Sequence, residues 1–253
     1  MRMRRWLLGL AGALAVALAA CAADSDALWK IINDRCVPGQ AQRGDPTPCA
    51  RVDVANGIAH GTVVLKDRNG IAQYLLMPSA KIPGIESPEI LAEDAPNYFA
   101  AAWEARDYMN ARLPRPLSRE ATSLAVNSSV GRTQNQLHIH ISCLRADIRD
   151  ALIAQRDAVG DDWAKLPAPL RGHPYQAMRL LGEAMTANPF RLLADRVAGA
   201  HADMGLRTLV AVGATFADGQ PGFLLLTDRA DPINNDRASG EELQDHDCAV
   251  ASN

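Results

Sequence analysis

Two histidines alternate with isoleucines in the segment 137–142. His138, His140 and Ser142 are each separated by one apolar residue, and Gln136 extends the alternation toward the N-terminus. Because successive side chains of a β-strand point to opposite faces, a strand here would place all four side chains on one face. Two neighbouring imidazoles are costly to bury as filler, since every ring nitrogen needs a partner and the pair cannot both be charged cheaply. The row therefore predicts a site that handles phosphate.

Two other interpretations of the pair stay open. In the first, both rings lie on a solvated sheet face and have no chemical role. In the second, His-x-His supplies two zinc ligands, with His173 or His246 as a third. No compact cluster of carboxylates or cysteines in the sequence completes such a set, so we expect no metal at the pair.

Strands rich in β-branched and apolar residues must position this row. The runs with strand character are 60–66, 72–77, 122–127, 137–143, 206–214 and 223–227. The first two flank the segment 67–70, where Asn69-Gly70 predicts a tight hairpin turn with positive backbone angles. The strands do not alternate with helices in a regular βαβ order, so the sequence predicts an α+β fold with an antiparallel sheet.

Helices are expected between these strands, at apolar residues with helical spacing. Their predicted starts are Asp94-Pro96, Asn188-Pro189 and a capping box of Ser239 with Glu242, and a further helix is expected around residues 148–152.

The first residues indicate export. Three arginines precede an apolar run that reaches Ala20, which is typical of a secretory leader and too short for a comfortable membrane span. Residues 18–21, ending in Cys21, resemble a bacterial lipobox, in which the leader is cut before a cysteine that then carries lipid. We therefore expect a signal peptide over 1–20, lipidation at Cys21 and a single domain over 21–253, anchored on the periplasmic side of a bacterial membrane.

The charge balance argues against nucleic acid as a partner. Removal of the leader takes away three arginines, which moves the formal net charge from −3 to −6. No basic stripe remains in the rest of the chain, so we do not expect it to bind nucleic acid.

Cysteine usage agrees with an oxidising compartment. Besides Cys21, the chain contains Cys36, Cys49, Cys143 and Cys248, and four cysteines allow three pairings. Cys36 and Cys49 flank a short loop and are the preferred pair, which would leave Cys143 to bind Cys248. A catalytic thiol at Cys143 is the competing interpretation.

A family resemblance covers most of the chain. The segment 133–143, with His138 and His140 at its centre, closely resembles the signature of bacterial CDP-diacylglycerol pyrophosphatases, a histidine-triad-like group. Further segments resemble the family in the same order, namely 74–78, 86–88, 170–173 and 244–248. The resemblance extends over about residues 28–250. It implies a histidine-triad-like antiparallel sheet with helices, elaborated by C-terminal helices and a hairpin.

The resemblance also implies a reaction. A histidine would attack the phosphorus next to the nucleoside, expel phosphatidate and form a nucleotidyl-histidine, which water would then hydrolyse to CMP. Donors would hold the nonbridging oxygens, and the candidates are Asn127, Gln134, His138 and Ser142. In a Gly- and Pro-flanked loop, Arg171 is a weaker candidate for phosphate contact and His173 is one for an acid or an orienting group. This chemistry requires neither a metal nor an organic cofactor.

The nucleophile is ambiguous, because the triad pattern has three alternating histidines and this chain has two. If Gln136 stands at the first position, His138 is central and nucleophilic; if Ser142 stands at the third, His140 is. The four-residue step from Gln134 to His138 resembles the step from the family's phosphate-loop glutamine to its first histidine, and this resemblance implies that His140 is the nucleophile. His60, His201 and His246 are expected to be structural.

The favoured function is hydrolysis of CDP-diacylglycerol at a membrane surface. A histidine-triad hydrolase or transferase acting on a soluble nucleotide is the second candidate. The third is a non-catalytic lipoprotein that binds nucleotides or lipids through the same pocket.

Overall fold

The computed structural model describes residues 24–252. The expected leader and Cys21 lie outside this range, so the predictions about them stay predictions. Within residues 24–252, none of the helices combines the length and the apolar character that crossing a bilayer would need.

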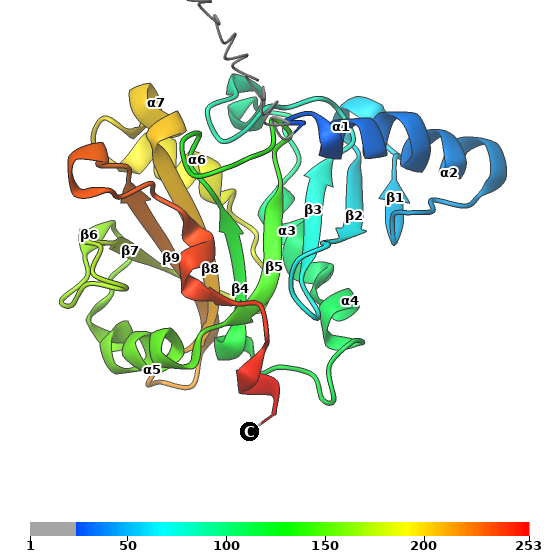
Figure 1. Cartoon of the computed structure of the whole chain (residues 1–253). Coiled ribbons are helices and arrows are strands. Elements are labelled where there is room, and N and C mark those ends of the chain that lie inside the picture. Colours follow the sequence, from blue (N-terminus) through cyan, green and yellow to red (C-terminus); the bar gives the residue numbers. More distant parts are fainter. Residues whose placement is uncertain (1–23, 253) are drawn as a thin grey trace, which may run out of the picture.

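A ten-stranded sheet forms the frame of the molecule, as the sequence predicted for an α+β fold (Figure 1). Its order is β1-β2-β3-β5-β4-β8-β9-β7-β6, with the short β10 paired to β5, and every neighbouring pair is antiparallel. The strands are β1 Arg51–Asp53, β2 Thr62–Lys66, β3 Tyr74–Pro78, β4 Thr122–Val126, β5 Ile139–Leu144, β6 Ala164–Lys165, β7 Gln176–Leu181, β8 Arg207–Thr215, β9 Pro221–Arg229 and β10 Gln244–Asp245. The histidine strand β5 is therefore central.

Helices cover both faces of this sheet. They are α1 Ala27–Ile31, α2 Val37–Arg43, α3 Tyr98–Glu104, α4 Arg106–Asn110, α5 Ala146–Gln155, α6 Pro189–Arg196 and α7 Ala200–Asp203. One turn of π-helix, Ile32–Cys36, joins α1 to α2. A 3₁₀ turn, η8 Gly240–Leu243, precedes β10, and the C-terminal segment crosses in front of β4 and β5 in Figure 1.

The largest hydrophobic core lies on the face of β5 that carries Ile139 and Ile141. Phe99 and Trp103 of α3 and Phe190 of α6 pack against it. Full burial of side chains of this size contributes about 1.5–3 kcal/mol each. This core fixes the odd-numbered face of β5 and leaves the even-numbered face for His138 and His140.

The opposite face of the sheet has two smaller apolar clusters with the histidine row between them. Leu75, directly opposite His140 on β3, belongs to the cluster covered by α1 and α2. Ala125, opposite His140 on β4, belongs to the cluster covered by α5. The polar row thus occupies the gap where neither helical layer covers the sheet.

The predicted hairpin is present, but the prediction of a tight turn is wrong. β2 pairs with β3, yet the connection runs from Asp67 to Gln73, and the backbone N–H of Asp67 donates to the carbonyl of Gln73 over 3.1 Å. Only Gly70 in this loop has a positive φ, at 71°. The tight turn is replaced because Asp67 and Gln73 direct their side chains toward His140, as described below.

The helix starts were predicted with mixed success. Asn188 caps α6 as expected, since its side chain accepts from the N–H of Phe190 over 3.0 Å. The cap of α3 is Asn97 and not Asp94. The capping box of Ser239 and Glu242 is wrong as well, because the Ser239 hydroxyl donates to Asn127 and the Glu242 carboxylate accepts from other side chains.

Both predicted disulfides are present, Cys36–Cys49 and Cys143–Cys248. The second excludes a catalytic thiol at Cys143. It ties the C-terminal segment to the histidine strand, one residue after Ser142. Two disulfides indicate an oxidising compartment and hence an exported protein.

Candidate active site

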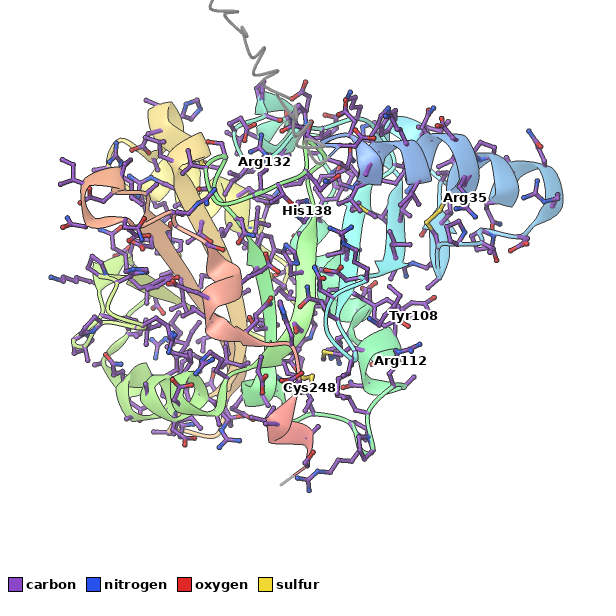
Figure 2. The ribbon with its side chains drawn as sticks, viewed as in Figure 1. Arg35, Tyr108, Arg112, Arg132, His138 and Cys248 are labelled. Carbon is purple, nitrogen blue, oxygen red and sulfur yellow. A yellow bond between two sulfur atoms is a disulfide. The ribbon has the colours of Figure 1, made fainter. Side chains whose placement is uncertain are left out.

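The alternation predicted on β5 brings the two histidines side by side. The ring centroids of His138 and His140 are 4.8 Å apart with the planes at 73°, on the same face of the sheet. Figure 2 shows His138 at the upper end of the central strands, on the side from which the sheet is viewed. Both side chains are largely buried, with 8 % and 5 % exposure. The interpretation as two freely solvated surface histidines is therefore wrong.

His138 is held as a single tautomer by the backbone. Its Nδ1 donates to the carbonyl of Gln136 over 2.6 Å. The other ring nitrogen, Nε2, then carries the lone pair, and within residues 24–252 it makes no hydrogen bond. An imidazole in this state is a ready nucleophile.

His140 has a different environment, built from carboxylates and an amide. Its Nδ1 lies 3.1 Å from Nε2 of Gln73, 3.2 Å from Oε1 of Glu241 and 3.9 Å from Oδ2 of Asp67. Glu241 is the acceptor that fits an N–H at this nitrogen. Nε2 of His140 is buried and has no partner within the described chain. The ring thus has negative charge beside Nδ1, while its Nε2 is enclosed by the protein.

Both imidazoles are held neutral at physiological pH. Burial lowers the pKa of His138 to about 4, and the neighbouring His140 adds to the effect. Burial also lowers the pKa of His140 to about 4, although the charge of Asp67 opposes this shift. A neutral ring keeps its lone pair available for attack on phosphorus.

These two pKa values predict that stability decreases in mild acid. Since both lie below the unfolded value of about 6.5, the unfolded chain binds more protons between about pH 6.5 and about pH 4. We expect the free energy of unfolding to drop by a few kcal/mol as the pH falls through this window. Denaturant unfolding of the parent at pH 7 and pH 5 would measure the drop. In the His138→Gln/His140→Gln double variant, most of this pH-dependent drop should disappear. A drop of equal size in that variant would assign the effect to other groups.

Asn127 and Ser142, which were expected to hold the nonbridging oxygens of the substrate, are both buried. The amide of Asn127 donates to Oε2 of Glu241 over 2.7 Å and accepts from the Ser239 hydroxyl over 3.1 Å. It therefore orients Glu241 behind His140. The Ser142 hydroxyl is fully buried without a partner among residues 24–252.

Gln134 is committed to the N-terminal segment. Its Oε1 accepts from the N–H of Leu28 over 3.1 Å, and its Nε2 donates to the carbonyl of Asp24 over 2.9 Å. Gln136 instead donates to the carbonyl of Pro78, the last residue of β3, and to that of Ala80. Because both ends of the Gln134 amide are engaged, the structure gives no support to its expected contact with substrate.

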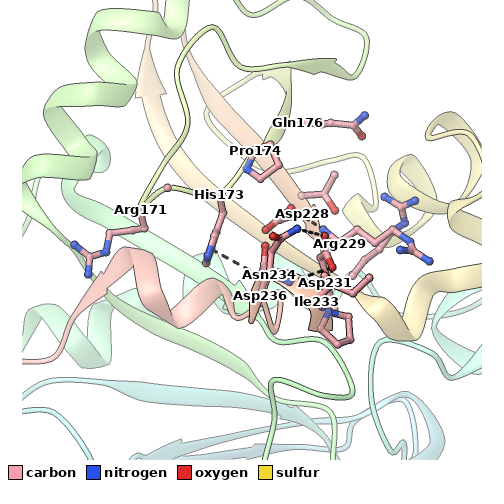
Figure 3. A pocket seen from close by; sticks show the side chains of 15 residues that line it. Arg171, His173, Pro174, Gln176, Asp228, Arg229, Asp231, Ile233, Asn234 and Asp236 are labelled. Carbon is pink, nitrogen blue, oxygen red and sulfur yellow. Dashed lines mark hydrogen bonds and ion pairs between the residues drawn. The ribbon is translucent and has the colours of Figure 1, made fainter.

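Arg171 and His173 line a separate hollow of about 1010 Å³ (Figure 3). Neither His138 nor His140 lines it. His173 donates from Nδ1 to Oε1 of Glu242 over 2.8 Å, and the hydroxyl of Tyr175 donates to the same oxygen. Burial acts to lower the pKa of His173, but the bond to Glu242 and the nearby carboxylates outweigh it and raise the pKa.

The zinc interpretation of the histidine pair is not supported by this arrangement. Among residues 24–252, the group of side chains that could hold a metal is His173, Asp228 and Asp236, and it includes neither member of the pair. His246, the other expected third ligand, lies 3.6 Å from Glu241 through Nε2.

The sequence did not reveal four side chains of the site. Asp67 and Gln73 were assigned to a turn and a strand, and Glu241 was attributed to a helix start, although each lies within 3.9 Å of His140. Gln244, which donates to the carbonyl of His140 over 3.1 Å, was also missed. The available signal was the segment 244–248, because its resemblance to the family extends to the C-terminal stretch.

Comparison with known proteins identifies the family. The family model described as CDP-diacylglycerol pyrophosphatase matches residues 23–252. The chain belongs to the CDP-diacylglycerol pyrophosphatase family. A CDP-diacylglycerol pyrophosphatase of Yersinia pestis is 47 % identical over 228 residues, which cover 90 % of this chain and 85 % of that protein. The family predicted from the histidine strand and the flanking segments is confirmed.

Proposed function

We propose that the chain hydrolyses CDP-diacylglycerol to CMP and phosphatidate, with His138 as the nucleophile. Membership of the family supports the substrate. The observation that carries the mechanism is the hydrogen bond from Nδ1 of His138 to the carbonyl of Gln136, which leaves the lone pair on Nε2. Fixing the tautomer in advance lowers the barrier, because the ring needs no reorganisation before it attacks.

The reaction proceeds in two displacements. The lone pair on Nε2 attacks the phosphorus of the cytidylyl group, and the bond to the bridging oxygen breaks with its electron pair leaving on phosphatidate. Water then attacks the same phosphorus, the P–N bond breaks and CMP leaves, which restores the neutral ring. Each displacement is easier than direct attack by water on the pyrophosphate.

His140 is proposed as the group that handles protons and the nonbridging oxygens. Its Nε2 is on the same face as His138, and Glu241 behind it stabilises a positive charge that develops on the ring. The proton of the attacking water can pass to this ring and then to solvent as CMP leaves. Asn127 keeps Glu241 in place through the 2.7 Å hydrogen bond.

The preference for His140 as nucleophile is therefore revised. Its Nε2 is enclosed without a partner, and the same atom of His138 is not enclosed in this way. The backbone carbonyl also fixes His138, whereas an ionisable network surrounds His140. This geometry favours the alignment in which Gln136 stands at the first position of the triad.

Anchoring at a membrane forms part of the proposal. Asp24, the first described residue, accepts from Gln134, four residues before His138. A lipid on Cys21 would be attached three residues earlier, which extended chain spans in about 11 Å. An acyl anchor there would hold the upper end of β5 close to the bilayer that contains the substrate.

The proposal is tested by CMP and phosphatidate release from CDP-diacylglycerol in detergent micelles with a chelator present. Release by the folded chain is expected. If the chain instead cleaves a soluble nucleotide such as a dinucleoside polyphosphate and leaves the lipid intact, the second candidate function holds. A chain that binds CMP but releases nothing would be the non-catalytic protein.

The role of Glu241 in positioning His140 can be tested by substitution. In Glu241→Gln the negative charge behind His140 is lost, and we expect kcat for CMP release to fall about 10- to 100-fold with KM changed less. The measurement is the pH profile of kcat, which should also shift, because a merely structural role would not move it. Glu104→Gln, an exposed change on α3, is the matched control. An unchanged kcat in Glu241→Gln would remove Glu241 from the mechanism.

A further inference from the structure

The carboxylates of Asp228 and Asp236 lie close together in the hollow. Asp228, at the end of β9, is 6 % exposed, and its Oδ2 is buried with no hydrogen-bond partner within residues 24–252. Asp236, in the following loop, is 5 % exposed and lies beside it. Buried carboxylates in contact need a shared proton or a bound cation. The unpartnered oxygen therefore marks a place for a proton or a cation.

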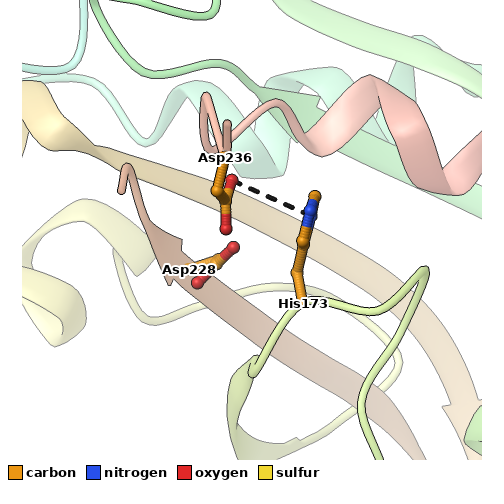
Figure 4. Close-up of side chains that lie close together, drawn as sticks. All are labelled: His173, Asp228 and Asp236. Carbon is orange, nitrogen blue, oxygen red and sulfur yellow. Dashed lines mark ion pairs between the residues drawn. The ribbon is translucent and has the colours of Figure 1, made fainter. Parts of the chain in front are cut away.

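His173 completes the group from a third segment of the chain. One ligand atom of each of His173, Asp228 and Asp236 lies within 4.8 Å of the other two (Figure 4). Nδ1 of His173 is 3.8 Å from Oδ1 of Asp236 and 2.8 Å from Oε1 of Glu242. Metal–ligand bonds of about 2.0–2.2 Å require ligand atoms about 3–4 Å apart, so small side-chain shifts suffice.

The arginines of the hollow do not neutralise these carboxylates. Arg207 and Arg229 both bind Asp203, over 2.6 and 2.7 Å. The guanidinium of Arg171 points away from Asp228 and Asp236 in Figure 3. The two carboxylates are thus left with His173 as their nearby basic group.

We propose that His173, Asp228 and Asp236 bind a divalent transition-metal ion, with Glu242 as a further ligand. One imidazole with carboxylate oxygens suits Mn²⁺ or Zn²⁺ better than Mg²⁺ or Ca²⁺, which take oxygen ligands. In this arrangement the ion replaces the proton on Nδ1 of His173 and the one between the carboxylates. The site differs from the zinc site considered for the histidine pair and takes no part in the proposed reaction.

The surroundings provide the support that metal ligands need. The N–H of Arg229 donates to Oδ1 of Asp228, and the N–H of Ala238 donates to Oδ1 of Asp236, each over 2.8 Å. The hydroxyl of Tyr175 orients Glu242 over 2.8 Å. Such second contacts fix the direction of the ligating atoms. The hollow gives an ion access from solvent.

The site would join four segments of the C-terminal half. Its ligands come from the loop before β7, the end of β9, the loop after β9, and η8. Glu242 follows Glu241 directly on η8, and Glu241 contacts His140. A bound ion would therefore stiffen the turn that also carries a residue of the histidine site.

Metal binding to the full chain tests the proposal. Chelator-treated protein in detergent is titrated with Mn²⁺, and free Mn²⁺ is followed by electron paramagnetic resonance; Zn²⁺ binding is followed by calorimetry. We expect one high-affinity equivalent per chain, weakened at least tenfold in Asp228→Asn and in His173→Ala. Asp107→Asn, an exposed change on α4, should bind as the parent does, and so should His138→Ala/His140→Ala.

The thermal midpoint gives a second readout that checks folding. A hundredfold excess of metal over Kd should raise the Tm of the parent by roughly 5 °C or more, with no shift in Asp228→Asn. Because the amide relieves the contact between carboxylates, metal-free Asp228→Asn should be at least as stable as the metal-free parent. Equal binding in the parent and in Asp228→Asn, or no binding by the parent, would overturn the proposal in favour of a shared proton. Neither readout uses CDP-diacylglycerol, so an inert enzyme would leave this result unaffected.

Discussion

His138→Ala is expected to lower the rate of CMP release from CDP-diacylglycerol at least a thousandfold. Of the two histidines on the strand, His138 is the one whose tautomer is fixed by a backbone carbonyl and whose lone pair is not enclosed, and the substitution removes this nitrogen. Without a nucleophile, the remaining donors can only assist direct attack by water. His140→Ala should lower the rate by about 10²–10⁴, the usual range for loss of an acid–base group.

Trapping the intermediate separates the two histidines more sharply than rates do. Substrate labelled in the cytidylyl phosphate should transfer label to the parent chain and to His140→Ala, as an acid-labile phosphoramidate, but not to His138→Ala. His60→Ala serves as the control, because His60 pairs with the exposed Asp94 outside the site. Label on His138→Ala, together with none on His140→Ala, would restore the other alignment and make His140 the nucleophile.

Loss of the Cys143–Cys248 disulfide is expected to have the largest effect on stability. It closes a loop with a sequence separation of 105, and the chain-entropy model assigns about 4.7 kcal/mol to a loop of about 100 residues. The Cys143→Ser/Cys248→Ser variant should therefore lose about 4–5 kcal/mol of unfolding free energy, with a Tm lower by roughly 10 °C or more. Denaturant unfolding of the full chain measures the loss.

The other disulfide provides the matched comparison. Cys36–Cys49 has a sequence separation of 13, for which the same model gives about 3 kcal/mol. The Cys36→Ser/Cys49→Ser variant should therefore be destabilised less. Equal losses in the two variants would mean that loop length does not govern the effect and that local packing does.

Local sequence patterns predicted those parts of the fold that rest on strand alternation and capping. His138 and His140 share a face because the period of a strand is two, and this holds whatever the neighbouring strands are. Asn188 caps α6 because its side chain reaches a free N–H nearby in the sequence. Patterns of this kind need no knowledge of distant contacts.

The predictions that proved wrong concern residues whose contacts come from distant segments of the chain. Asn69-Gly70 favours a tight turn, but Gln73 contacts His140 and Glu241, which are far away in the sequence, and the loop opens to allow this. Ser239 would cap η8 if Asn127 did not take its hydroxyl. Glu241 could not be assigned from sequence, because its neighbours come from the residue after β4, from β5 and from the loop before β3. Tertiary contacts override local preference at these positions.

The binding of Asp24 to Gln134 changes how the rate of such an enzyme should be described. A chain attached to a bilayer through the residues before Asp24 meets CDP-diacylglycerol by lateral diffusion, not by collision from bulk water. Its velocity then follows the mole fraction of substrate in the surface, and diluting that surface with other lipid slows the reaction even when the total amount of substrate is constant. Under the proposed anchoring at Cys21, the composition of the membrane, and not the volume around it, would set the effective concentration of substrate.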